Sequence, residues 1–134
     1  MFKWAPGGNP AERNLKLQGE LFFGDLTGTF NGVGVAQDQW GWYLQAIYQF
    51  MPRWRFGVRH DEVKASSVDS ALTGSSLDNL GESPQRESAM LDYSTSEFGR
   101  FRIQYNYDRV RPQTDHQLLF QYTVSFGAHG AHSY

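Results

Sequence analysis

Residues 39–50, with the sequence QWGWYLQAIYQF, alternate between large apolar side chains and small or polar ones. The even positions carry Trp40, Trp42, Leu44, Ala46, Tyr48 and Phe50, and the odd positions include Gly41, Gln45 and Gln49. An alternation of period two predicts a β-strand with one apolar face. Strands of soluble proteins mostly have about five or six residues, whereas strands that cross a bilayer have about 9–11. The length of this segment therefore favours a transmembrane strand.

The same alternation recurs along the rest of the chain. It is clear in residues 53–61, 98–108 and 115–126, is weaker in residues 14–23 and 88–94, and indicates a partial strand at residues 2–4. The pattern predicts an all-β fold, an antiparallel up-and-down meander of about six to seven strands. No internal boundary divides residues 1–134, and a tail is expected at residues 127–134.

The connections between the predicted strands alternate in length. Tight turns are expected at residues 6–13, 51–52 and 95–97, and longer loops at residues 25–38, 62–87 and 109–114. In a meander this order places every short turn at one end and every long loop at the other. Outer-membrane barrels, with periplasmic turns and extracellular loops, have this arrangement.

Composition excludes several classes of protein. The 134 residues include 12 Lys and Arg, 14 Asp and Glu and no Cys, which gives a net charge of −2. This balance argues against nucleic-acid binding, and the lack of Cys excludes disulfides and thiolate metal sites. No run of about 18 apolar residues predicts a membrane helix. The first residues lack the apolar core of a signal peptide, so a signal is expected upstream of Met1.

Large rings gather near the ends of the predicted strands. Trp40, Trp42, Tyr48, Phe50 and Trp54 would form the aromatic girdles that lie at the two water–lipid boundaries of a barrel. The opposite face carries Gln, Asn, Arg and Asp, as expected for the wall of an aqueous lumen. Since backbone groups in hydrocarbon need protein partners, the strands must belong to a closed barrel. Strands upstream, or other copies of the chain, would complete it.

Two alternatives remain at this stage. A soluble lipocalin-like barrel or sandwich that binds an apolar ligand would have the same alternation, with its rings directed inward. An outer-membrane barrel whose lumen is filled by side chains would be structural and would have no pore.

The segment LLFQYTVSF, residues 118–126, resembles the C-terminal assembly signal of bacterial outer-membrane proteins. Its elements would be Phe120, Tyr122, Val124 and either Phe126 or Tyr134. Together with residues 2–23, 40–61 and 127–132, it is similar to the C-terminal portion of Gram-negative porin-like barrels. Some of these are grouped with phosphate-selective porins, and others are labelled zinc-regulated TonB-dependent receptors.

The resemblance implies a location in the bacterial outer membrane, with lipid and the barrel-assembly machinery as partners. It implies that the tail at residues 127–134 is periplasmic, and that the barrel is a channel for small hydrophilic solutes.

Charged side chains on the polar face are candidates for solute selection. Six are positive and four are negative: Lys16, Arg53, Arg55, Arg59, Arg100 and Arg102 against Glu20, Asp61, Asp92 and Asp108. A ladder of guanidinium groups in a channel would favour anions. The alternative is a network of ion pairs that braces the wall.

Metal binding and catalysis have little support in the sequence. His129 and His132 lie three residues apart, but two imidazoles in a Gly/Ala tail are too few for a closed zinc site. His60 and His116 lie elsewhere, near the loop ends of their strands. No nucleophile motif such as GxSxG is present, so neither an enzyme nor a cofactor is expected.

Overall fold

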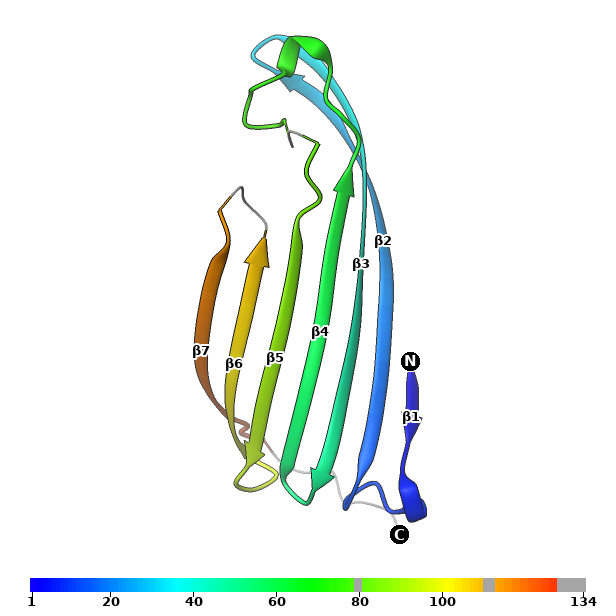
Figure 1. Ribbon diagram of the computed structural model, residues 1–134, viewed down its shortest axis with the longest axis vertical. Coiled ribbons are helices and arrows are strands. Elements are labelled where there is room, and N and C mark those ends of the chain that lie inside the picture. Colours follow the sequence, from blue (N-terminus) through cyan, green and yellow to red (C-terminus); the bar gives the residue numbers. More distant parts are fainter. Residues whose placement is uncertain (79–80, 110–112, 128–134) are drawn as a thin grey trace.

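The computed structural model describes residues 1–78, 81–109 and 113–127. Seven strands form one sheet in the order of the chain, each antiparallel to the next (Figure 1). They are β1 (Phe2–Trp4), β2 (Asn14–Phe30), β3 (Val33–Met51), β4 (Trp54–Ala65), β5 (Gln85–Ser94), β6 (Gly99–Arg109) and β7 (Asp115–Val124), with 3-10 turns η1 (Pro6–Gly8) and η2 (Ser70–Leu72). The predicted all-β antiparallel meander of six to seven strands is confirmed. None of the described residues forms a helix that is long and apolar enough to cross a bilayer.

The connections at the lower end in Figure 1 are short, as the sequence predicts. They are the segment around η1, the turn at Pro52 and Arg53, and the turn at residues 95–98. The loop between β4 and β5, which carries η2, lies at the opposite end (Figure 1). It spans residues 66–84 and is shorter than predicted, because β4 runs on to Ala65 and β5 begins at Gln85.

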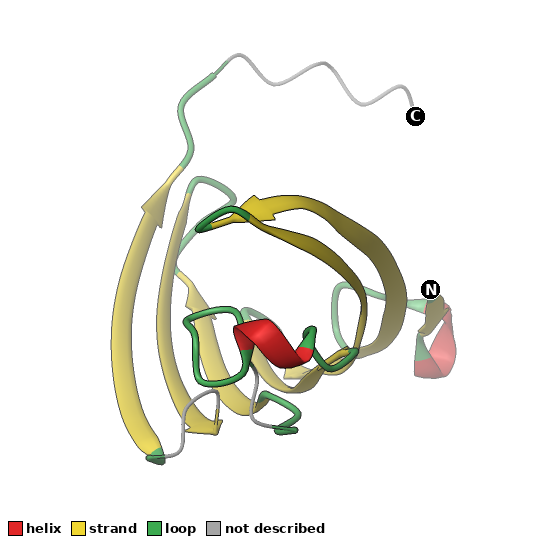
Figure 2. Cartoon of the chain, turned by 90° about the horizontal axis from the view of Figure 1, so that it is seen from above, coloured by secondary structure: helices red, strands yellow, loops and turns green. Residues whose placement is uncertain are grey.

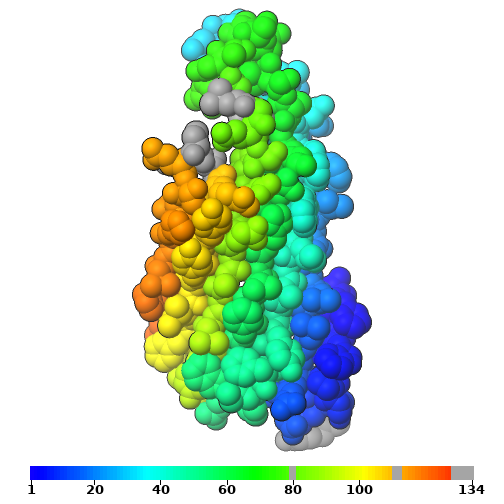
Figure 3. Space-filling model, in the orientation of Figure 1, coloured from blue at the N-terminus to red at the C-terminus, as the bar shows by residue number. Residues whose placement is uncertain are grey.

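The predicted loop over residues 25–38 is wrong, because β2 and β3 continue through it as a paired hairpin. The hairpin turns at Asn31 and Gly32, which have φ angles of 49° and 80°. Two successive positive φ angles match the twist of antiparallel strands, and Asn-Gly adopts them readily. This hairpin and the η2 loop rise above the ends of β5–β7 (Figure 3).

Two residues near the β3–β4 turn do not lie where the alternation predicts. Arg53 is in the turn itself, exposed and with a φ angle of 72°, so it does not belong to the polar face. Phe50 lies at a register shift between Gln49 and Met51 and has no partner in β4. Phe50 is the extra residue of the bulge, and Arg53 is part of the tight turn that reverses the chain.

The register places apolar and polar residues in separate rows that run across the sheet. One row is Leu17, Ala46, Val58, Ala89, Tyr105 and Leu118, and the adjacent row is Gln18, Gln45, Arg59, Ser88, Asn106 and Gln117. Because alternate side chains point to opposite faces, each row belongs to one face. The sheet thus has an apolar face and a polar face through β2–β7.

Seen from above, the strands form a strongly curved sheet whose two edges do not pair with each other (Figure 2). Side chains crowd together on the concave face of a curved sheet and spread apart on the convex face. Polar-face residues are buried, with Asp92 at 0%, Asn106 at 4% and Asp108 at 6% exposure, while Phe23 and Phe120 are 79% and 73% exposed. The polar face is therefore concave, and the apolar face is convex. Among the described residues only Tyr43 and Leu72 are buried hydrophobic side chains.

Candidate functional site

The candidate site is the concave face, which we call the polar wall. Its main side chains are Lys16, Gln18, Glu20, Tyr43, Gln45, Arg55, Arg59, Asp61, Arg86, Ser88, Asp92, Arg100, Arg102, Gln104, Asn106, Asp108 and Gln117. Nine of the ten charged residues predicted for this face share it, and the exception is Arg53. Regular alternation along β2, β4, β5 and β6 positions them there.

Asp92 on β5 joins three strands. Arg102 of β6 donates from Nε to Asp92 Oδ1 at 2.7 Å and from Nη2 to Oδ2 at 3.0 Å. Arg55 of β4 approaches Asp92 Oδ2 to 3.3 Å. The carboxylate is fully buried, and the bidentate geometry is the strongest form of this interaction. The cluster braces the wall near its turn end.

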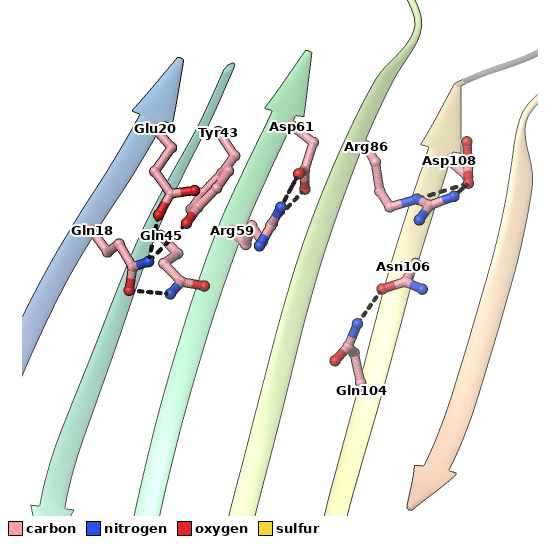
Figure 4. A network of polar contacts seen from close by, with 10 residues as sticks. All are labelled: Gln18, Glu20, Tyr43, Gln45, Arg59, Asp61, Arg86, Gln104, Asn106 and Asp108. Atoms are coloured by element: carbon pink, nitrogen blue, oxygen red, sulfur yellow. Dashed lines mark hydrogen bonds and ion pairs between the residues drawn. The ribbon is translucent and has the colours of Figure 1, made fainter. Parts of the chain in front are cut away.

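Two further ion pairs lie nearer to the loop end (Figure 4). Arg59 Nε donates to Asp61 Oδ1 at 2.9 Å within β4, and Arg86 Nε of β5 donates to Asp108 Oδ2 of β6 at 2.8 Å. Sequence reasoning missed Arg86, because the predicted strand began at residue 88. Its even position, in phase with Ser88 and Asp92, is the signal that identifies it.

Amide and phenol groups continue the polar wall across β2 and β3 (Figure 4). Gln18 Nε2 donates to the Tyr43 hydroxyl at 2.8 Å, and Gln45 Nε2 donates to Gln18 Oε1 at 3.2 Å. The Arg59 guanidinium lies 3.9 Å from the centre of the Tyr43 ring. Such a contact is a cation–π interaction, and it links the amide groups to the Arg59–Asp61 pair.

A hollow of about 440 Å³ lies in the middle of the polar wall. Ile47, Gly57 and Met90 lie in one row across β3–β5 and line it. Val58, Gln104 and polar side chains from other rows complete the lining. A Cβ atom at Gly57 would come within 2.6 Å of Met90 Cε. The glycine therefore leaves the space in which the Met90 side chain lies.

A smaller polar hollow of about 200 Å³ lies near the turn end and includes Arg55, Arg100 and Thr123 in its lining. Arg100 Nε and Thr123 Oγ1 are buried and have no hydrogen-bond partner in the described part of the chain. Arg100 is also in no ion pair there, in contrast to Arg55, Arg59, Arg86 and Arg102.

The residues predicted for the aromatic girdles lie on the convex face, apart from Phe50 at the bulge. Trp40 and Trp42 lie beside the loop end of β4, where Trp42 Nε1 donates to Glu62 Oε2 at 2.9 Å. Tyr48 and Trp54 lie toward the turn end, and the Trp54 ring is 4.7 Å from that of Tyr93.

Two histidines also face outward and are paired. His60 Nδ1 lies 2.7 Å from Glu87 Oε1, and His116 Nδ1 lies 2.6 Å from the Tyr105 hydroxyl. No cluster of three or more potential metal ligands occurs within the described ranges.

The predicted assembly signal falls partly within the described residues. Phe120, Tyr122 and Val124 point to the convex face from β7, and Phe126 follows the strand with 93% exposure. Tyr134, His129 and His132 lie outside the described residues, as does the predicted tail from residue 128 onward.

Comparisons with known proteins provide little further evidence. No family model matches the sequence, and no solved structure matches it. An "Uncharacterized protein" of Aquifex aeolicus is 26% identical over 131 residues, which cover 91% of this chain and 27% of the relative. The chain thus spans about a quarter of the length of this curated relative.

Proposed function

We propose that the chain is a wall segment of an outer-membrane β-barrel channel that passes small hydrophilic solutes. The observation that carries the proposal is the inverted distribution of side chains. Apolar side chains cover the convex face and are exposed, whereas charged and amide side chains fill the concave face. A soluble sheet of this curvature would expose its polar face to water instead.

The convex face has dimensions that suit a bilayer. On β3 the outward residues run from Tyr48, toward the turn end, through Ala46 and Leu44 to Trp42 and Trp40. Eight residue steps of about 3.3 Å at a tilt of about 40° span on the order of 20 Å, close to the apolar band of about 25 Å of a barrel. The amphipathic rings at its two ends would lie in the headgroup regions.

Closure of the barrel requires further strands. β1 pairs only with Leu15–Leu17, so most of the outer edge of β2 has no partner strand among the described residues. The outer edge of β7, on the side away from β6, has none there either. An edge of this kind would leave backbone groups unpaired in hydrocarbon. Strands upstream or other copies would supply the partners. Insertion by the barrel-assembly machinery and an upstream signal peptide belong to the same proposal.

The lipocalin-like alternative requires an apolar interior, and the charged concave face argues against it. A structural barrel without a pore is the remaining rival. The ion pairs favour bracing of the wall as the main role of Arg59, Arg86 and Arg102. A preference for anions would then depend on Lys16 and Arg100, which are in no such pair within the described ranges.

The proposal is tested by two neighbouring substitutions on β6. Ile103 faces outward and Gln104 inward, so Ile103→Arg should destabilise the full-length protein in lipid vesicles by about 2–4 kcal/mol, whereas Gln104→Arg should have a much smaller effect. Denaturant unfolding in vesicles measures both. Equal stability of the two variants would contradict a lipid-facing convex surface.

A channel is distinguished from a structural barrel by conductance. The full-length protein, reconstituted in planar bilayers, should produce discrete current steps in salt solution. A protein that inserts stably and yields no current would support the structural barrel.

A further inference from the structure

The central hollow of the polar wall combines an apolar floor with a polar rim. Ile47 and Met90 lie on either side of Gly57 in one row. Gln45, Arg59 and Ser88 lie in the next row toward the loop end, and Arg102 lies in the next row toward the turn end. The volume of about 440 Å³ falls within the range of ligand pockets, about 300–1,000 Å³.

The rim is polar, and every guanidinium on it lies beside a carboxylate. Arg59 is paired with Asp61 and Arg86 with Asp108, while Arg102 shares Asp92 with Arg55. An inorganic anion would therefore meet a carboxylate next to each guanidinium, which weakens its attraction to the rim. This distinguishes the hollow from the turn end, where Arg100 lies.

The rim nevertheless offers many hydrogen-bonding positions. A guanidinium has five N–H donors and a carboxylate about four lone-pair positions, and the ion pairs use only some of them. Gln45, Ser88 and Gln104 add amide and hydroxyl groups. These planar groups can bind to vicinal hydroxyl groups, and the Ile47 and Met90 side chains can cover the C–H face of a sugar ring.

We propose that this hollow is a binding subsite for neutral, hydroxyl-rich solutes of the sugar class. The inference rests on the proposed channel, whose lumen the polar wall would line. A solute moving along the wall would pause in the hollow, against the Ile47 and Met90 side chains.

The test uses the full-length protein in planar bilayers with maltose as the probe. Maltose should reduce the salt current in a saturable manner, and inorganic phosphate at the same concentration should not compete. The double variant Gln45→Ala with Gln104→Ala should weaken the block about tenfold, because two hydrogen-bonding amides are lost from the rim. The matched control is Gln117→Ala with Gln121→Ala on β7, outside the hollow.

The outcomes separate this inference from the proposed function. Block that is weakened in the first variant and retained in the control supports the subsite. A conducting channel without maltose block, or with equal loss in both variants, overturns the subsite and leaves the channel intact. Displacement of maltose by phosphate would show an anion site and also overturn it. The absence of any current would contradict the channel itself.

Discussion

Asp92 depends on two guanidinium groups, one from each neighbouring strand. Removal of its charge in Asp92→Asn would leave Arg55 and Arg102 close together without their counter-ion. Loss of one partner from a buried ion pair is strongly destabilising, so we expect a loss of about 3 kcal/mol in the free energy of unfolding. Denaturant titration in vesicles measures it. Asp115→Asn, at an exposed carboxylate that accepts from Gln117, serves as the control and should change stability little.

Individual residues show how far alternation can be used for prediction. Parity assigned Arg55, Arg59, Arg100 and Arg102 to one face, and the register agrees. It failed for Arg53 and Phe50, because a turn and a bulge interrupt the period of two near residue 51. Which cation pairs with which carboxylate depends on the register between strands. The alternation along one strand does not predict that register.

The β2–β3 hairpin depends on its turn. Gly32 has a φ angle of 80°, which a β-branched residue rarely adopts, so Gly32→Val should open the hairpin tip. Hydrogen exchange should then become about tenfold faster in residues 26–37 and remain unchanged in β6, because the strain is local.

Gly28→Val is the matched control for the hairpin. Gly28 lies on β2 without a positive φ angle, and a Cβ atom there meets nothing within 4 Å. Valine is favoured in strands, so exchange should stay the same or slow. Faster exchange in both variants would show that the hairpin is weakened by bulk and not by the turn geometry.

At the level of elements, strand positions were largely predictable and connections were not. Rings and aliphatic residues at every second position identified the middle of β2–β7. Residues 25–38 were predicted as a loop because Gly, Asp and Asn occur there, although Asn31-Gly32 is itself a hairpin signal. The hollow at Gly57 could not be predicted, since it arises where Ile47, Gly57 and Met90 come together from three strands.

At the level of the whole molecule, the distribution of charge along the wall should determine the ion selectivity of the proposed channel. Arg100→Gln removes a cation that is in no ion pair of the described residues, so the ratio of anion to cation permeability should fall about twofold. Reversal potentials of the full-length channel in a salt gradient measure the ratio. The double variant Arg59→Gln with Asp61→Asn removes a neutral pair and should leave it unchanged. An equal change in both would contradict a special role for Arg100.

The short β1 has a consequence for handling the segment in water. Beyond Leu17 the outer edge of β2 offers a long row of backbone donors and acceptors with no partner strand among the described residues, and the outer edge of β7 offers another on the opposite side. Exposed edges of this kind act as templates for joining chains strand to strand. The segment produced alone in water should therefore polymerise into sheet-rich assemblies. Chaperones or detergent would have to cover the two edges until further strands pair with them.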